Sequence, residues 1–250
     1  MSRNSKHKLK SFTLAEHFLE FKYCLMKVVV SFIIVTIIAF QFSWDIFHFL
    51  SKPLARLSED YGNFHFIYTK LTEGFVTELK ISFISSFFLC SPIFFYQLYK
   101  FLEPGLYKDE KKTIMPYIFF PPVLFLIGVL LVYFIVMPIT WKFFISFQNI
   151  SPKNGIPIIL EAKVSEYIDL VVELFIGFGL AFQLPILLVM LTKLKIINYL
   201  QLKKFRRYAV VLIFILAAIL TPPDVISQVI LALPLVLLYE ISIFLCKRIK

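Results

Sequence analysis

Long apolar runs constrain this chain more than any other feature of its sequence. A helix that crosses the hydrocarbon core of a bilayer needs about 20 predominantly apolar residues. Four stretches qualify, and they are 25–42, 75–99, 114–134 and 167–191. Hydrophobic residues make up 59% of the chain, whereas a soluble domain holds about 45 to 50%. We therefore expect an integral membrane protein.

A further apolar region follows residue 207 and is interrupted by the sequence TPPD, which ends at Asp224. The two prolines lack backbone donors and disfavour helical conformations in the residues before them, so a helix should end there. Asp224 is suited to cap the next helix, because a carboxylate accepts the free amides at a helix start. We expect a short helical hairpin with spans near 207–220 and 225–246.

The six expected spans form one all-α, polytopic membrane domain over residues 1–250, with an amphipathic N-terminal segment at 1–24. Basic residues gather in four places that fall on one side of these spans: 1–24, 100–112, 193–207 and the C-terminus. Positively charged segments remain on the cytoplasmic or matrix side of a membrane. Both termini are therefore expected on that side, and this distribution accounts for the formal net charge of +10 without a nucleic-acid partner.

Motifs for catalysis or metal binding are missing from the sequence. It holds no GxxxxGK[ST], HExxH or GxSxG pattern, and its three cysteines are too widely spaced to form a CxxC pair. We therefore expect no enzymatic activity, no metal and no organic cofactor. A secondary transporter of a small solute or ion is the alternative function, although such transporters usually show repeated halves, and none is visible here.

The N-terminal stretch TLAEHFLEFKYCLMK predicts an amphipathic helix that continues into the first span. Glu16 and Glu20 lie one turn apart on its more polar side, with Lys22 beside them. Solvated charges on an interfacial helix would explain these residues. A carboxylate site for a ligand is the alternative.

The first loop on the basic side, YKFLEPGLYKDEKK, offers aromatic and acidic groups together at the membrane surface. The aromatic residues are Phe101 and Tyr107, and the acidic ones include Glu103 and Glu110. A local charge cluster is one interpretation, in which Glu103 pairs with Lys100 on the same helix face. The other is a carboxylate that receives a cationic ligand from the cytoplasm.

Several segments resemble, in order along nearly the whole chain, the C subunit of the twin-arginine protein translocase, the TatC family. The forms most like this chain are alphaproteobacterial or mitochondrially encoded. The matching segments are EHFLEFK, KPL, YTKLTEGFVTELK, YQLYKFLEPGLYKDEKK, FGLAFQLPI, RRYAVV and TPPDVISQVILALPLVLLYE.

The resemblance implies a concave, glove-like bundle of six transmembrane helices that binds signal peptides bearing paired arginines. Two family glutamates that bind the arginine pair match Glu20 and Glu110. A guanidinium offers a planar fork of donors that a carboxylate accepts in a bidentate pair. Lys22 stands where many relatives have arginine, and Phe101 and Tyr107 would pack around the peptide. Glu103 would assist the contact if it is not engaged by Lys100.

Other family positions lie away from this site. Pro53, in the first outer loop, matches a position important for activity, although its simplest interpretation is a structural turn. Gln183, near mid-membrane, stands where many relatives have Glu, and it either forms an interhelical hydrogen bond or hydrates the concave face. Asp224, Gln228 and Glu240 belong to the hairpin that would contact partner subunits.

The resemblance also implies partners and a place in the cell. The partners are twin-arginine signal peptides of folded cargo proteins, single-span TatA/TatB-type subunits, other copies of the chain and membrane lipid. The expected function is that of the core receptor in proton-gradient-driven export of folded proteins. The expected location is the bacterial inner membrane, with the mitochondrial inner membrane as the alternative.

Overall fold

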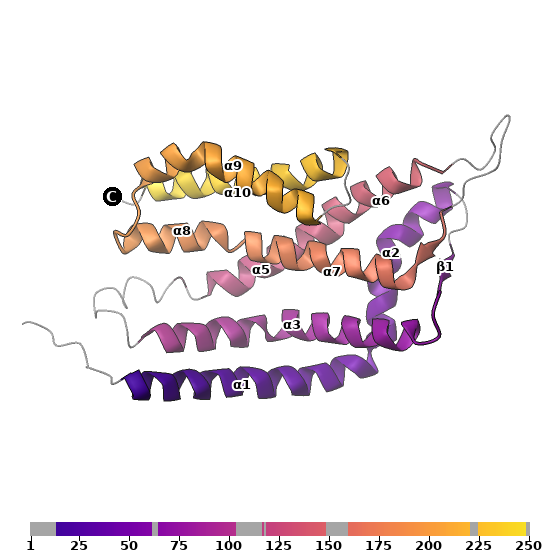
Figure 1. Ribbon diagram of the computed structural model, residues 1–250, viewed down its shortest axis with the longest axis horizontal. Helices are drawn as coiled ribbons and strands as arrows, with labels where there is room; N and C mark the ends of the chain where they lie inside the picture. The colour runs from indigo at the N-terminus through magenta and orange to yellow at the C-terminus, as the bar shows by residue number, and fades with distance from the viewer. Residues whose placement is uncertain are drawn as a thin grey trace, which may run out of the picture.

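The computed structural model describes residues 14–61, 65–103, 117, 119–148, 160–220 and 225–248. These residues form long helices that lie side by side (Figure 1). The helices are α1 (Leu14–Gln41), α2 (Ser43–Tyr61), α3 (Glu73–Leu102), α5 (Phe120–Leu131), the π-helical turn η3 (Val132–Val136), α6 (Met137–Ile145), α7 (Val164–Ala181), α8 (Leu184–Lys193), α9 (Tyr199–Leu220) and α10 (Val225–Arg248). Two short strands, β1 (Phe66–Ile67) and β2 (Ala162–Lys163), pair in parallel.

Five helical segments of the described chain are long and apolar enough to cross a membrane. They are Glu16–Gln41, Glu73–Phe101, Phe120–Ile145, Val164–Lys193 and Gln228–Arg248. The prediction of an all-α, multi-span membrane protein is confirmed. The fifth expected crossing, near 207–220, lies in α9, which packs against α10 but carries four basic residues in its first half, and these lower its hydropathy. We call the end of the bundle that holds the start of α1 and the end of α10 the inner side, and the opposite end the outer side (Figure 1).

The third and fourth crossings are interrupted, and a proline follows each interruption. The third contains the π-helical turn η3, which ends two residues before Pro138. The fourth is divided between α7 and α8, with Phe182 and Gln183 in a turn and Pro185 in the first turn of α8. Proline has no N–H for the carbonyl four residues earlier, so one regular helical hydrogen bond is lost at each of these points.

The core is centred on α7, which contacts α3, α5 and α9. Its buried side chains include Ile168, Val171 and Leu174. Two glycines allow α5 and α7 to approach closely. A Cβ on Gly128 would lie 2.9 Å from the backbone oxygen of Phe178, and one on Gly179 would lie 2.4 Å from the ring of Phe125. Small residues at such crossings permit close backbone contact between membrane helices.

On the outer side, α2 runs steeply across the other helices (Figure 1). The prediction of a turn at Pro53 is wrong, because this proline is buried inside α2. Its missing N–H leaves the carbonyl of Phe49 without the regular helical bond. The hydroxyl of Tyr133 donates to that carbonyl at 3.0 Å, so a distant side chain satisfies the acceptor and permits the proline. Tyr167 donates in the same way to the carbonyl of Leu50 at 2.7 Å.

Candidate functional site

The inner ends of α1 and α3 are joined by aromatic contacts. The ring of Phe101 stacks on His17 with 4.5 Å between ring centroids. It also meets the ring of Phe21 edge-on at 5.3 Å. Because His17 and Phe21 are one turn apart on α1, both reach the same ring on α3. These contacts fix the rotation of α1 about its axis relative to α3, and therefore the position of Glu20 on α1.

Glu20 has an unsatisfied carboxylate oxygen. Its side chain is 42% exposed, yet the Oε2 atom is buried and has no hydrogen-bond partner among the described residues. Among the described residues, the ring nitrogen His17 Nδ1 lies 3.9 Å from this oxygen, which is too long for a hydrogen bond. A buried acceptor without a donor is costly, so this oxygen favours a ligand that brings an N–H group.

Gln97 adds a second unsatisfied acceptor one turn before Phe101. Its Oε1 atom is buried and likewise has no hydrogen-bond partner in the described part of the chain. Gln97 and Phe101 line a small cavity of about 70 Å³ between α1 and α3. The remaining lining residues are Phe21, Cys24, Leu25, Val28, Phe94 and Leu98. Neither Gln97 nor His17 was predicted from the sequence. An amide within an otherwise apolar span could have indicated Gln97.

The other residues expected at this site are only partly described. Lys22 is exposed on α1. Glu103 is half-buried directly after α3, where its backbone N–H donates to the carbonyl of Tyr99. Tyr107 and Glu110 lie outside the described residues, as does Asp224 of the hairpin. The structure therefore places both Glu20 and Phe101 close to His17 and leaves Glu110 untested.

Gln183 occupies the break between α7 and α8. Its Nε2 donates to the carbonyl of Pro121 at 3.0 Å and to that of Gly179 at 3.4 Å. The interhelical hydrogen bond considered for this residue is therefore present. Its Oε1 is buried and has no hydrogen-bond partner within the described ranges. Gln183 also lines an apolar cavity of about 330 Å³ that includes Phe95 of α3 and Ile186 of α8.

Two polar residues of the hairpin, Gln228 and Glu240, form contacts within the chain itself. Glu240 of α10 forms an ion pair with Arg206 of α9. Gln228 donates from Nε2 to the carbonyl of Phe214 at 3.0 Å. Both contacts join α9 to α10, so they stabilise the hairpin whether or not the same residues contact a partner.

On the outer side, Glu73 is a structural residue that the sequence reading missed. Its buried carboxylate accepts hydrogen bonds from the backbone and hydroxyl of Thr69 at 2.7 and 3.1 Å, and from the backbone of Lys70 at 3.2 Å. It also accepts from the backbone and hydroxyl of Ser165 at 3.2 and 2.7 Å. Glu73 thereby ties the segment before α3 to the start of α7. Pro53 lies on this same outer side, at the other end of the bundle from Glu20.

These features define a class of protein: a polytopic helical membrane protein whose inner face presents unsatisfied acceptors beside aromatic rings. Within the described residues, no three His, Cys, Asp or Glu side chains gather in a way that would hold a metal ion.

Comparisons with known proteins identify the family. The family model described as Sec-independent protein translocase protein (TatC) matches residues 16–234. A protein of Rickettsia prowazekii (strain Madrid E), named Sec-independent protein translocase protein TatC, is 48% identical over 242 residues, which cover 97% of this chain and 95% of that relative. A TatC-like protein of Reclinomonas americana is 36% identical over 242 residues, 97% of this chain and 90% of the relative. The chain belongs to the TatC family.

A solved structure agrees with this assignment. The crystal structure of a twin-arginine translocase receptor, TatC, superposes with a TM-score of 0.77 at 38% sequence identity. The superposition covers 93% of this chain and 98% of that one. The chain is thus a protein-transport component of the Sec-independent pathway with several membrane spans.

Proposed function

We propose that this chain is the receptor subunit of a twin-arginine translocase and binds twin-arginine signal peptides at the inner ends of α1 and α3. The observation that carries the proposal is that Glu20 Oε2 on α1 and Gln97 Oε1 on α3 are both buried and have no hydrogen-bond partner among the described residues, on the two helices that the Phe101–His17 contact joins. A guanidinium group brings several N–H donors in one plane and remains charged at every physiological pH. It suits this arrangement better than the compact ammonium of lysine does.

The partly buried position of Glu20 strengthens the proposed contact. An exposed ion pair contributes about 0 to 1 kcal/mol, whereas hydrogen bonds to charged groups contribute about 1.5 to 3 kcal/mol. In the proposed complex one arginine pairs with Glu20 and the other with Glu110, and Glu103 adds negative charge nearby. Tyr107 and the exposed edge of Phe101 contact the peptide, while Lys22 limits how closely a cation approaches from the α1 side.

We further propose that the whole chain, 1–250, acts as one domain with partners on the membrane. Single-span TatA/TatB-type subunits and other copies of the chain would contact the hairpin around Asp224, Gln228 and Glu240, together with the concave face that carries Gln183. Pro53 contributes through the outer end of α2. The proton gradient drives export of the folded cargo, and the proposed location is a bacterial inner membrane.

The test is photocrosslinking of a signal peptide to the chain in membrane vesicles. We compare the native chain with Glu20→Gln, Glu110→Gln and Gln97→Leu, using an Arg-Arg peptide and a Lys-Lys peptide. Glu161→Gln is the matched control, because Glu161 is an exposed carboxylate on the outer side. We expect the Arg-Arg peptide to lose about tenfold or more in crosslinking with Glu20→Gln, as the loss of a charged hydrogen bond implies.

The Lys-Lys peptide should crosslink weakly to the native chain, and Glu161→Gln should behave as the native chain does. Equal crosslinking of both peptides to the native chain and to Glu20→Gln would contradict the assignment of the site. A loss that appears equally in Glu161→Gln would show a general charge effect and would also contradict it.

A further inference from the structure

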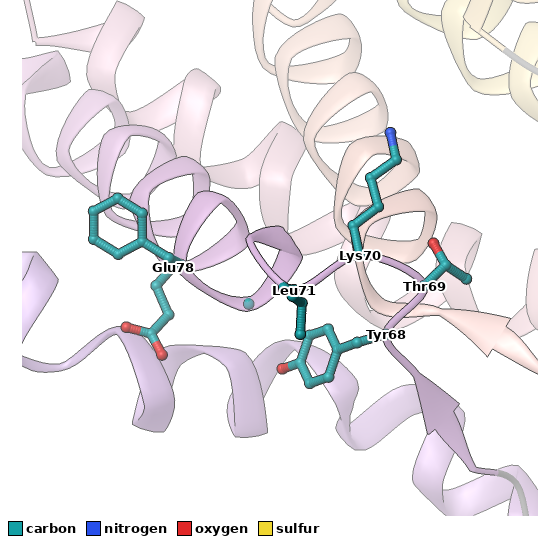
Figure 2. A pocket seen from close by; sticks show the side chains of 7 residues that line it. Tyr68, Thr69, Lys70, Leu71 and Glu78 are labelled. Carbon is teal, nitrogen blue, oxygen red and sulfur yellow. The ribbon is translucent and has the colours of Figure 1, made fainter.

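An open pocket of about 560 Å³ lies beside the outer end of α3, at the other end of the molecule from Glu20. Its lining residues are Tyr68, Thr69, Lys70, Leu71, Gly74, Phe75 and Glu78. In Figure 2 the side chains of Tyr68 and Glu78 extend to the same side of α3, whereas Lys70 extends away from them. The charged group on the same side as Tyr68 is therefore the Glu78 carboxylate, which is negative.

The walls of this pocket have the chemistry of an ammonium site. Glu78 is half-buried, and the hydroxyl of Ser43 donates to its Oε2 over a long 3.4 Å. That distance leaves the carboxylate able to accept a stronger donor. Tyr68 and Phe75 supply aromatic rings, whose faces attract cations. The ring of Tyr68 lies against Gly74, where an added Cβ would be only 3.7 Å from the ring.

The surroundings indicate that the occupant is a membrane lipid. Leu71 lies two residues before α3 and is fully exposed. Phe75 lies in the first turn of α3 and is 60% exposed, and α3 is long and apolar enough to span the membrane. Exposed apolar side chains at this level lie in the membrane interface. Glu78 follows the start of α3 by five residues, or about 7.5 Å, which places its carboxylate close to the depth of lipid headgroups.

From this combination we propose that the pocket binds the headgroup of phosphatidylethanolamine from the outer leaflet. The primary ammonium donates to Glu78 and lies against the rings of Tyr68 and Phe75, while the acyl chains follow the exposed surface near Leu71. A primary ammonium is favoured over a trimethylammonium, because the Glu78 carboxylate and the Tyr68 hydroxyl, which both line the pocket, are hydrogen-bond acceptors. The site is separate from the proposed signal-peptide site and does not depend on it.

The test is native mass spectrometry of the purified full chain, exchanged into micelles with one added phospholipid. The probes are phosphatidylethanolamine, phosphatidylglycerol and phosphatidylcholine with identical acyl chains. A partly exposed ion pair predicts about two- to fivefold greater retention of phosphatidylethanolamine than of either other lipid. Glu78→Gln should remove this preference, and Glu161→Gln, at an exposed carboxylate on the same side, should keep it.

Phe75→Leu is the second variant, because an exposed ring is replaced without a change in the core. It should weaken the preference while leaving helical content unchanged, so the proposal stays testable even if Glu78→Gln fails to fold. Equal retention of all three lipids by the native chain would overturn the proposal. So would a preference that survives in both Glu78→Gln and Phe75→Leu. Retention of phosphatidylcholine as strong as that of phosphatidylethanolamine would overturn the assignment to a primary ammonium.

Discussion

The crossing of α5 over α7 predicts a specific cost for adding one methyl group. In Gly128→Ala, the new Cβ would lie 2.9 Å from the backbone oxygen of Phe178 and 3.0 Å from the ring of Phe182, whereas ordinary contact begins at 3.4 Å. The nearest atom belongs to the backbone, so no side-chain rotation relieves the overlap and the two helices must separate.

Overpacking of this kind costs about 1 to 3 kcal/mol, and replacing glycine by alanine inside a helix returns up to about 1 kcal/mol. We therefore expect Gly128→Ala to lower the free energy of unfolding by about 1 to 2 kcal/mol. For a chain of this length the corresponding fall in Tm is about 2 to 8 °C. Gly179→Ala should lower the Tm by at least as much, because its Cβ would lie 2.4 Å from the buried ring of Phe125.

The assay is thermal unfolding in detergent, followed with a dye that fluoresces on reaction with thiols. Cys90 and Cys246 are buried free cysteines, so they react when the bundle opens. Gly74→Ala is the matched control, since its Cβ would have its nearest neighbours at 3.7 to 3.9 Å. That variant should keep or slightly raise the Tm. A Gly128→Ala chain as stable as Gly74→Ala would refute the argument from close approach.

Further predictions concern single contacts. Tyr133→Phe should cost about 1 to 2 kcal/mol by leaving the carbonyl of Phe49 unsatisfied, and Pro53→Ala should recover part of this loss in a double-mutant cycle measured by Tm. Glu73→Gln should speed amide exchange at Thr69, Lys70 and Ser165, measured by deuterium uptake; unchanged uptake would argue against the tie. Glu240→Gln should cost less than about 1 kcal/mol, and high salt should erase the difference in Tm if Arg206 acts as its ion-pair partner. The hydrogen bond to Glu166 raises the pKa of Lys163 above 10.5, so that contribution is present below pH 10.5 and lost as pH rises further; a Glu166→Gln chain that already matches the native Tm at pH 8 would contradict this.

The sequence predicted the helical membrane architecture because the signal for it is local. An apolar run such as 75–99 is readable without knowing what packs against it, and the matching helix α3 runs from Glu73 to Leu102. The interruption after Ala181 was not predicted, since 167–191 was expected as one continuous span. Pro185 lies close to the break, but nothing near it in sequence shows whether a proline kinks, breaks or merely begins a helix.

The remaining features depend on contacts between distant residues. Pro53 was expected in a turn, and the hydroxyl that makes a helix possible there belongs to Tyr133. The structural role of Glu73 depends on a hydrogen bond from Ser165, which is far away in the chain. At the candidate site, the family resemblance directed attention to Glu20, whereas Gln97 and His17 became visible only once α1 and α3 were packed together.

The break at Gln183 gives the fourth crossing a mechanical property that a continuous helix would lack. On its outer side α7 is fixed in the core by α3 and α5, while on its inner side α8 packs against α10. A single amide, Gln183 to the carbonyl of Pro121, bridges the joint to a neighbouring helix. The direction of the inner half relative to the outer half is therefore set by this amide and by packing against different neighbours, and not by an unbroken ladder of helical hydrogen bonds.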